Sequence, residues 1–362
     1  MKFSALDRLL HRMLLGRGPL GELQIDLNER FAGTAGADDA NTQELGCIHI
    51  TGLARAGTTS VLEYLDRHRA GESLRYRNMP FVLAPAFWAR LGLPPKGRIL
   101  PPRERMHADG LTIELDTAEA LEEPFWMHAS GQFPGARGQP SWLSPFVRNG
   151  IPALAKRYRM YITIFLRLKR ATRYLCKNNN NHLRIECLVE AFANTSILIV
   201  FRDPVAHAAS LLRQHRRFSD IQQRDPFVLE YMNLIGHYEF GRGRLPFRYP
   251  DAQGREQEPW WPNLDPAILD YWLEQWLQTY RYLAVQAERR PANIVLVSYE
   301  RLCSDSAYLE LLHDRLSLGP PVDGGFFTAP PADILLEDEA DSGRVRSAQD
   351  LYRQLDEMSG SP

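Results

Sequence analysis

The stretch Thr51-Gly-Leu-Ala-Arg-Ala-Gly-Thr-Thr-Ser60, called the phosphate loop below, decides the fold of this chain. The apolar segment before it, residues 47–51, predicts a buried strand, and the amphipathic segment Thr58–Arg69 after it predicts a helix. Gly52 and Gly57 permit backbone angles that residues with a side chain rarely adopt. Successive backbone N–H groups and a helix N-terminus can then converge on an anion. The stretch therefore predicts a phosphate-binding turn between a strand and a helix.

Other apolar runs extend this unit into a sheet. Ser196–Phe201 and Asn293–Tyr299 predict two more buried strands, and Arg173–Lys177 predicts a weaker fourth one. The helical patterns between them are Thr58–Arg69, Ser144–Arg170, His182–Phe192, Val205–Arg216 and Asp265–Ala287, the last with Asp265 and Pro266 as its predicted N-cap and first residue. Apolar strands that alternate with helices indicate a sheet covered on both faces. We expect an α/β fold of three layers, with a mainly parallel central sheet flanked by helices.

Composition and charge argue against some classes of function. The chain has 362 residues, 44% hydrophobic and 24% charged, which is ordinary for a water-soluble protein. Its net charge of −1 gives no global basic field, so nucleic acid is not an expected partner. The four cysteines form no C-x-x-C pair and no zinc-site spacing, so we expect no metal. Reduced packing cysteines suit a reducing compartment, and we expect a cytoplasmic protein.

The N-terminal segment mixes leucines with arginines, and it lacks the continuous apolar core of a signal peptide. It predicts an amphipathic helix that packs on the domain, with peripheral contact to a membrane surface as the alternative. No run reaches the roughly 18 apolar residues that a membrane-spanning helix needs.

The phosphate loop differs from the nucleotide P-loop, G-x-x-x-x-G-K-[ST], at one decisive position. Gly52, Gly57 and Thr59 match that pattern, but Thr58 stands where the P-loop has its lysine. Because that lysine reaches the β- and γ-phosphates of a triphosphate, its replacement argues against ATP or GTP chemistry. Arg55 offers a cation to a single phosphate group instead.

A second candidate anion site follows the strand Ser196–Phe201. Arg202-Asp203-Pro204 turns the chain there, and Ser210 lies two turns into the helix that follows. Arg202 thus stands at the carboxyl end of a strand, where open α/β sheets bind ligands. Tyr299 ends the third strand in the same way.

In this order and spacing, the motifs resemble the 3′-phosphoadenosine-5′-phosphosulfate (PAPS)-dependent sulfotransferases, with the phosphate loop closest to their bacterial branch. The resemblance covers about residues 47–305 and implies a P-loop-like sulfotransferase fold with PAPS as co-substrate and no metal. It implies that Arg202 and Ser210 bind the 3′-phosphate and that Tyr299 faces the adenine. The residues implied to hold the 5′-phosphosulfate end are Arg55, Ala56, Gly57, Thr58, Thr59 and Ser60.

The stretch Cys176-Lys-Asn-Asn-Asn-Asn-His-Leu-Arg-Ile185 resembles another element of that family, although Asn179 stands where proline is usual. The resemblance implies that Lys177 stabilises the leaving phosphate or the sulfuryl oxygens. Asn181 would then orient the site, and Arg184 could pair nearby.

The general base is sought in an acidic stretch. Thr117-Ala-Glu-Ala-Leu-Glu-Glu-Pro-Phe-Trp126 resembles an acidic segment of the bacterial branch, so we favour Glu123 as the base, then Glu122. His107 is a third candidate. Solvated helix acids with no catalytic part would show the same pattern.

We divide the chain into an N-terminal helical extension (1–45), a sulfotransferase domain (46–320) with an inserted loop at about 238–264, and a C-terminal helical tail (321–362). The expected reaction moves a sulfuryl group to a hydroxyl or amine of a small-molecule, carbohydrate or lipid acceptor. The aromatic-rich stretch Gly241–Trp261 is a candidate wall of the acceptor site. A P-loop kinase or NTPase and a catalytically silent nucleotide-binding module are the alternatives.

Overall fold

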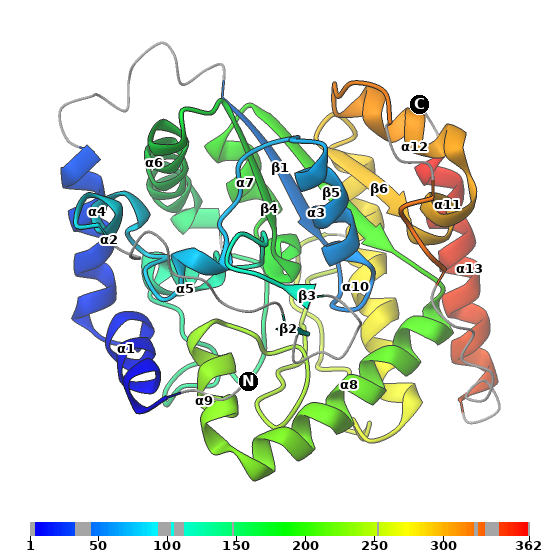
Figure 1. The fold of residues 1–362 in the computed structure, drawn as a ribbon. Helices are drawn as coiled ribbons and strands as arrows, with labels where there is room; N and C mark the ends of the chain where they lie inside the picture. The colour runs from blue at the N-terminus through cyan, green and yellow to red at the C-terminus, as the bar shows by residue number, and fades with distance from the viewer. Residues whose placement is uncertain are drawn as a thin grey trace.

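The computed structural model describes residues 4–32, 45–92, 103–104, 112–146, 148–251, 253–321, 325–329 and 340–360. Its centre is a parallel sheet in the order β4-β1-β5-β6 (Figure 1). The strands are β1 (Gly46–Thr51), β4 (Arg173–Lys177), β5 (Asn194–Phe201) and β6 (Ile294–Ser298). The α/β class and the parallel sheet are confirmed, including the weak fourth strand.

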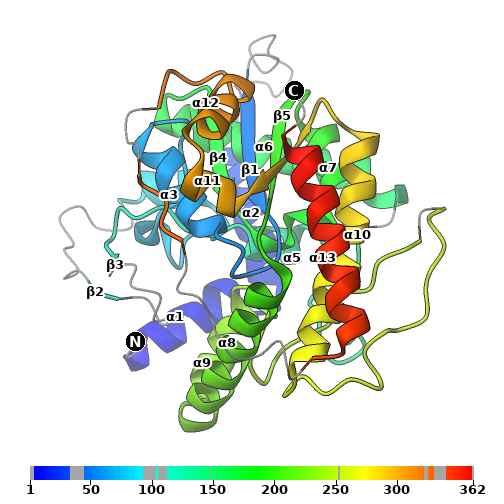
Figure 2. The same cartoon turned by 90° about the vertical axis from the view of Figure 1, so that its right-hand side faces the viewer.

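Helices cover both faces of this sheet, because its side chains alternate between two apolar clusters. Ile48 and Leu198 join one cluster, whereas Cys47 and Ile199 join the other. The first cluster is covered by α3 (Thr58–Arg67), α11 (Tyr299–Ser304) and α12 (Ser306–Arg315). The second is covered by α6 (Ile151–Lys169), α7 (Ile185–Ala191), α8 (Pro204–Arg224), α10 (Leu269–Arg289) and α13 (Ser342–Ser359). Figure 2 shows α10 and α13 side by side, with α3, α11 and α12 across the sheet.

The carboxyl ends of the four parallel strands lie at one edge of the sheet. Each end is followed by one of the predicted motifs: the phosphate loop after β1, the 3-10 helix η4 (Asn179–Leu183) after β4, Arg202 after β5 and Tyr299 after β6. The parallel topology alone thus gathers motifs that are far apart in the sequence.

Several predicted helix ends shift. Asp265 and Pro266 do not begin α10, the last of the helices predicted from the sequence, which starts at Leu269 with Ile268 as its N-cap. Asp265 instead holds a preceding turn, because its carboxylate accepts from the Ala267 N–H at 2.8 Å and its carbonyl accepts from the Ile268 N–H.

Two other helices start later than predicted. His182 belongs to η4, so that α7 begins at Ile185, and α6 begins at Ile151 rather than Ser144. The helix after Arg202 is longer than predicted and continues to Arg224.

The N-terminal segment forms two helices, α1 (Ala5–Leu15) and α2 (Pro19–Ala32). Helix α1 packs on α9 (Pro226–Leu234) through the ion pairs Arg8–Asp225 and Arg12–Glu230. Its outer face exposes Leu6, Leu9 and Met13. Contact of this face with a membrane stays a prediction. No helix among the described residues combines the length and apolar character that crossing a bilayer requires.

At the other end of the chain, α13 packs on α10, β6 and α8, and Leu351 and Leu355 are buried in the main core. Between α9 and α10, the described residues of 235–268 form neither helix nor strand. The remaining elements are η2 (Tyr76–Asn78), α4 (Pro85–Arg90), β2 (Arg103–Glu104), β3 (Thr112–Ile113), α5 (Glu123–Ser130) and η3 (Arg148–Gly150).

Candidate active site

The phosphate loop has a backbone that few sequences could adopt. Gly52, Arg55 and Gly57 all have positive φ angles, of 133°, 72° and 99°. A Cβ atom on Gly52 would lie 2.5 Å from the Val200 carbonyl oxygen, and one on Gly57 would lie 2.2 Å from Cδ2 of Tyr299. Both glycines are therefore required by close approach as well as by backbone angle. The loop presses against β5 on one side and against the end of β6 on the other.

Arg55 and Arg202, predicted to bind different phosphates, lie next to each other. Arg202 is only 7% exposed and donates from Nη1 to the backbone oxygen of Arg55 at 3.3 Å. Arg55 in turn donates from Nε to Oγ of Ser210, also at 3.3 Å. The buried Nε of Arg202 has no hydrogen-bond partner among the described residues. Hydrogen bonds thus join two arginines and a hydroxyl in one group, and these are the residue types that bind anions.

Asp203, the N-cap of α8, and His207, in the first turn of that helix, hold this arrangement. Asp203 caps α8 by accepting from the Ala206 N–H at 2.8 Å. His207 is fully buried and its Nε2 lies 2.8 Å from the Ala54 carbonyl in the phosphate loop. Burial and the nearby charge of Arg202 lower the pKa of His207 to about 3, so the ring is neutral and donates from Nε2. Sequence reasoning missed His207, whose signal is its place one turn into the helix after Arg202.

Tyr299 closes the far side of the phosphate loop. Its ring is the nearest group to Gly57, and its hydroxyl donates to the Thr328 carbonyl at 3.4 Å. Phe327 packs edge-on against this ring, with 6.1 Å between ring centroids. An aromatic wall therefore stands beside the start of α3.

Residues 178–181 after β4, called the asparagine-rich turn below, are hydrogen-bonded to the phosphate loop through Asn179. The Thr51 hydroxyl donates to the Asn179 carbonyl at 2.9 Å, and the Thr58 hydroxyl donates to Oδ1 of Asn179 at 3.2 Å. The proline usual at this position could not supply this side-chain amide. Lys177, at the end of β4, is buried beside this turn.

Glu123 is held as a buried ion pair. Arg184 donates from Nη1 and Nη2 to its two oxygens, both at 2.8 Å, and Asn178 donates to Oε2 at 2.7 Å. Burial alone would raise the pKa of Glu123, but the charge and hydrogen bonds of Arg184 outweigh it, so the pKa is lowered. Such a carboxylate has both oxygens occupied and little affinity for a proton.

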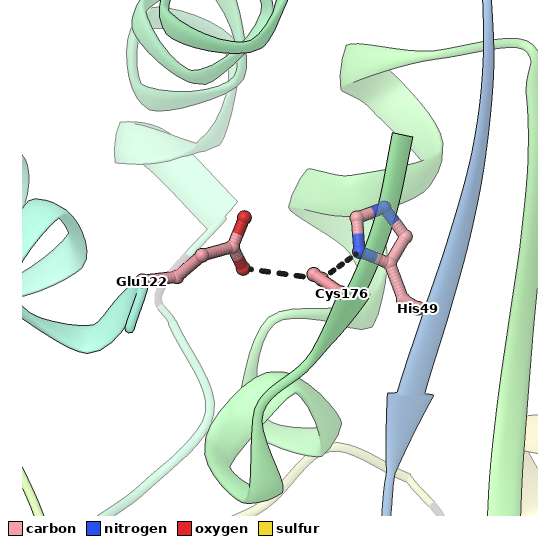
Figure 3. A group of neighbouring side chains, drawn as sticks. All are labelled: His49, Glu122 and Cys176. Atoms are coloured by element: carbon pink, nitrogen blue, oxygen red, sulfur yellow. Dashed lines mark hydrogen bonds between the residues drawn. The ribbon is translucent and has the colours of Figure 1, made fainter. Parts of the chain in front are cut away.

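Glu122 is buried and points toward Cys176 on β4, and it ends a chain of polar groups that continues to His49 on β1 (Figure 3). Tyr158 donates to its Oε1 at 2.8 Å, Cys176 donates to its Oε2 at 3.3 Å, and Nδ1 of His49 lies 3.1 Å from the Cys176 sulfur. Burial raises the pKa of Glu122 and lowers that of His49 to about 3. This is the one group of three or more metal-ligating side chains found among the described residues, with ligand atoms within 4.8 Å of one another.

Comparison with known proteins accounts for this set of motifs. A family model described as "Sulfotransferase family" matches residues 47–238, just over half of the 362-residue chain. The chain belongs to the sulfotransferase family. The matched region of this family member includes the phosphate loop, Lys177, Arg202 and Ser210, whereas Tyr299 lies beyond it. The family match and the fold together indicate that the protein is a transferase.

Two solved structures are similar to this chain, and the first of them supports the fold assignment. Sulfotransferase STF9 from Mycobacterium avium is similar with a TM-score of 0.53 at 13% identity, over 99% of this chain and 87% of that one. Sulfotransferase STF1 from Mycobacterium tuberculosis H37Rv has a TM-score of 0.45 at 12% identity, over the same shares of the two chains. No curated protein matches this sequence.

The structure therefore divides the candidate residues into groups. Arg55, Arg202 and Ser210 come together, Thr58 joins Asn179, and Tyr299 packs on Gly57. Ala56 is buried, and Thr59 and Ser60 are half-buried in the first turn of α3. Glu122 and Glu123 are engaged in the core, and His107 lies outside the described residues.

Proposed function

We propose that this family member transfers the sulfuryl group of PAPS to a hydroxyl or amine acceptor by in-line displacement. The contact between Arg202 and Arg55 is the observation that supports this proposal most strongly. It joins the two candidate anion sites at the ends of the neighbouring strands β1 and β5. PAPS has a 3′-phosphate and a 5′-phosphosulfate on one ribose, so it needs two such sites close together.

In this proposal each end of the nucleotide has its own residues. Arg202 and Ser210 bind the 3′-phosphate, and the buried Nε of Arg202, which has no partner within the described part of the chain, is available as a further donor. Tyr299 and Phe327 form an aromatic wall for the adenine. The 5′-phosphosulfate end lies on the N-terminus of α3, and its proposed contacts are Arg55, Ala56, Gly57, Thr58, Thr59 and Ser60.

The chemistry needs positive charge where the leaving group forms. As the bond from sulfur to the 5′-phosphate oxygen breaks, negative charge grows on that oxygen and on the sulfuryl oxygens. Lys177 and Arg55 are the residues we assign to this charge, together with the backbone N–H groups of the phosphate loop. These charges need no metal ion to assist them.

Thr58 argues against the kinase or NTPase alternative. Its hydroxyl is committed to Asn179, and its side chain is buried. A P-loop kinase needs a long cationic side chain at this position to reach a triphosphate.

We place the acceptor beside the loop Gly241–Trp261. This loop packs on the asparagine-rich turn, because the Tyr249 hydroxyl lies 2.8 Å from Nε2 of His182 and Phe247 packs edge-on against the same ring. The aromatic side chains of this loop suit a carbohydrate, lipid or other small-molecule acceptor. Exchanging the loop should change acceptor choice and leave affinity for the nucleotide unchanged.

A calorimetric titration tests the donor assignment. Adenosine 3′,5′-bisphosphate, the product left by PAPS, should bind wild type and bind Arg55→Ala and Arg202→Ala much more weakly. A competing triphosphate should not displace it, and tighter binding of ATP would refute the proposal. A screen of hydroxyl and amine acceptors with labelled PAPS then separates an enzyme from a silent binding module.

A further inference from the structure

Glu239 is a buried acid that no motif singled out. It lies between α9 and the loop Gly241–Trp261 and is only 6% exposed. One oxygen, Oε1, accepts a hydrogen bond from Nδ2 of Asn179 at 2.9 Å. The other, Oε2, is buried without a hydrogen-bond partner among the described residues, and Nδ1 of His237 is 3.7 Å from it.

A carboxylate oxygen buried in this way is costly. A buried polar atom without a partner loses its hydration and gains nothing in return, and native proteins contain few of them. Each such group calls for an explanation, and a catalytic role that needs an unengaged atom is one of them. Glu239 contrasts here with Glu123, whose two oxygens accept from Arg184 and Asn178.

Asn179 places Glu239 next to the phosphate loop. The amide oxygen of Asn179 accepts from the Thr58 hydroxyl, while its amide nitrogen donates to Glu239. Since a carboxylate can only accept, the amide of Asn179 has one orientation. A single side-chain amide therefore separates the Glu239 carboxylate from the first residue of α3, where the proposed phosphosulfate lies.

The backbone around Glu239 is also fixed. Gly236 has a φ of 69°, and a Cβ there would lie 2.1 Å from Cγ of Glu123. The carbonyl of Gly236 accepts from Asn180 at 3.3 Å, and the ring of Phe240 packs against that of Phe218. The segment therefore keeps its place against the asparagine-rich turn, and the carboxylate keeps its place relative to Thr58.

We propose that Glu239 is the general base of the sulfuryl transfer. The acceptor oxygen attacks sulfur, and the bond between sulfur and the 5′-phosphate oxygen breaks. The acceptor proton passes to Oε2 of Glu239, and adenosine 3′,5′-bisphosphate leaves with the electron pair of the broken bond. Asn179 is a positioning residue that holds Oε1. This assignment rests on the proposed function.

The test is Glu239→Gln, which keeps an oxygen for the Asn179 hydrogen bond and removes the basic one. We expect kcat with a weakly acidic alcohol or phenol to fall by about 10²–10⁴-fold, while affinity for adenosine 3′,5′-bisphosphate stays unchanged. Across acceptors of graded acidity, the loss should shrink as the acceptor becomes more acidic, because an ionised acceptor needs no base. Glu288→Gln, at an exposed position on α10, is the matched control and should behave as wild type.

The outcomes separate this inference from the proposed function. If Glu239→Gln slows all acceptors equally, or weakens nucleotide binding as well, Glu239 is structural and the inference is overturned. If the Gln variant does not fold, Glu239→Asp is measured instead. It should keep the wild-type dependence on acceptor acidity at a lower kcat, and wild-type turnover at every acidity would overturn the inference. If wild type neither binds the bisphosphate nor uses PAPS, the proposed function fails first.

Discussion

Arg202 reaches from the end of β5 into the phosphate loop and donates from Nη1 to the backbone oxygen of Arg55 over 3.3 Å. This hydrogen bond joins two motifs that are 147 residues apart in the chain. The guanidinium group of Arg202 can therefore bind a phosphate and also stabilise the phosphate loop, whose positive φ angles are otherwise unfavourable. The phosphate loop and the second candidate anion site are therefore expected to act as one unit.

The role assigned to Arg202 predicts a difference between two nucleotides. Arg202→Met should weaken binding of adenosine 3′,5′-bisphosphate by about 10- to 100-fold, because charge-assisted hydrogen bonds contribute ~1.5–3 kcal/mol. Binding of AMP, which lacks the 3′-phosphate, should change little. Calorimetric titration of both nucleotides checks this, and an equal loss for both would mean that Arg202 acts only through the loop.

Gly57 should tolerate alanine less well than another glycine of similar backbone angle. Gly57→Ala brings a Cβ against the Tyr299 ring, whereas a Cβ on Gly138, where φ is 80°, would meet no atom of the described residues within 4 Å. Both substitutions carry a backbone cost of about 1–3 kcal/mol. Only Gly57→Ala should also weaken nucleotide binding, as measured by titration of folded protein. Equal nucleotide affinities in the two variants would contradict the close packing of Tyr299 on the loop.

The buried ion pair between Glu123 and Arg184 should contribute to the free energy of unfolding. Glu123→Gln leaves the Arg184 charge buried, and breaking one side of a buried ion pair costs about 3–5 kcal/mol. Urea denaturation measures this loss, and the double substitution Glu123→Gln with Arg184→Met should cost less than the sum of the single ones. A Glu123→Gln variant of wild-type stability and no turnover would instead support Glu123 as the base.

Acid should destabilise the protein through its buried histidines. Burial lowers the pKa of His49, His182 and His207 to about 3 each, below the ordinary value of 6.5. Between pH 6.5 and about 3 the unfolded chain therefore binds protons that the native chain does not. Stability is full above pH 6.5 and falls with decreasing pH, by about 2 kcal/mol per histidine at pH 5. Urea denaturation at pH 7.5 and pH 5 tests this, and equal free energies of unfolding would contradict neutral native histidines.

The chain of His49, Cys176 and Glu122 is expected to be a hydrogen-bond chain and not a metal centre. Cys176→Ala should lower stability by about 1–3 kcal/mol, because Glu122 loses a donor in a buried site. Treatment of wild type with a chelator should leave its melting temperature unchanged. One equivalent of tightly bound zinc, lost in Cys176→Ala, would contradict this interpretation.

Local pattern was sufficient for much of the architecture. Apolar runs bounded by glycine, asparagine or arginine identified β1, β4, β5 and β6, because a strand buried on both faces must be apolar along its length. The spacing of Gly52 and Gly57 indicated the turn between β1 and α3, because a turn of that kind needs backbone angles open mainly to glycine. The predicted start of α10 was wrong, because Asp265 and Pro266 are as common in a turn as at the start of a helix.

The sequence by itself thus determined which motif follows each strand and which two arginines belong to the candidate anion sites, since each depends on residues adjacent in the chain. Only the tertiary structure decided which acid has a carboxylate oxygen without a hydrogen-bond partner among the described residues. Glu123 meets Arg184 across 61 residues of sequence, and Glu239 meets Asn179 across 60. Tertiary packing brings such distant residues into contact. The local sequence therefore does not indicate whether both oxygens of a carboxylate are hydrogen-bonded.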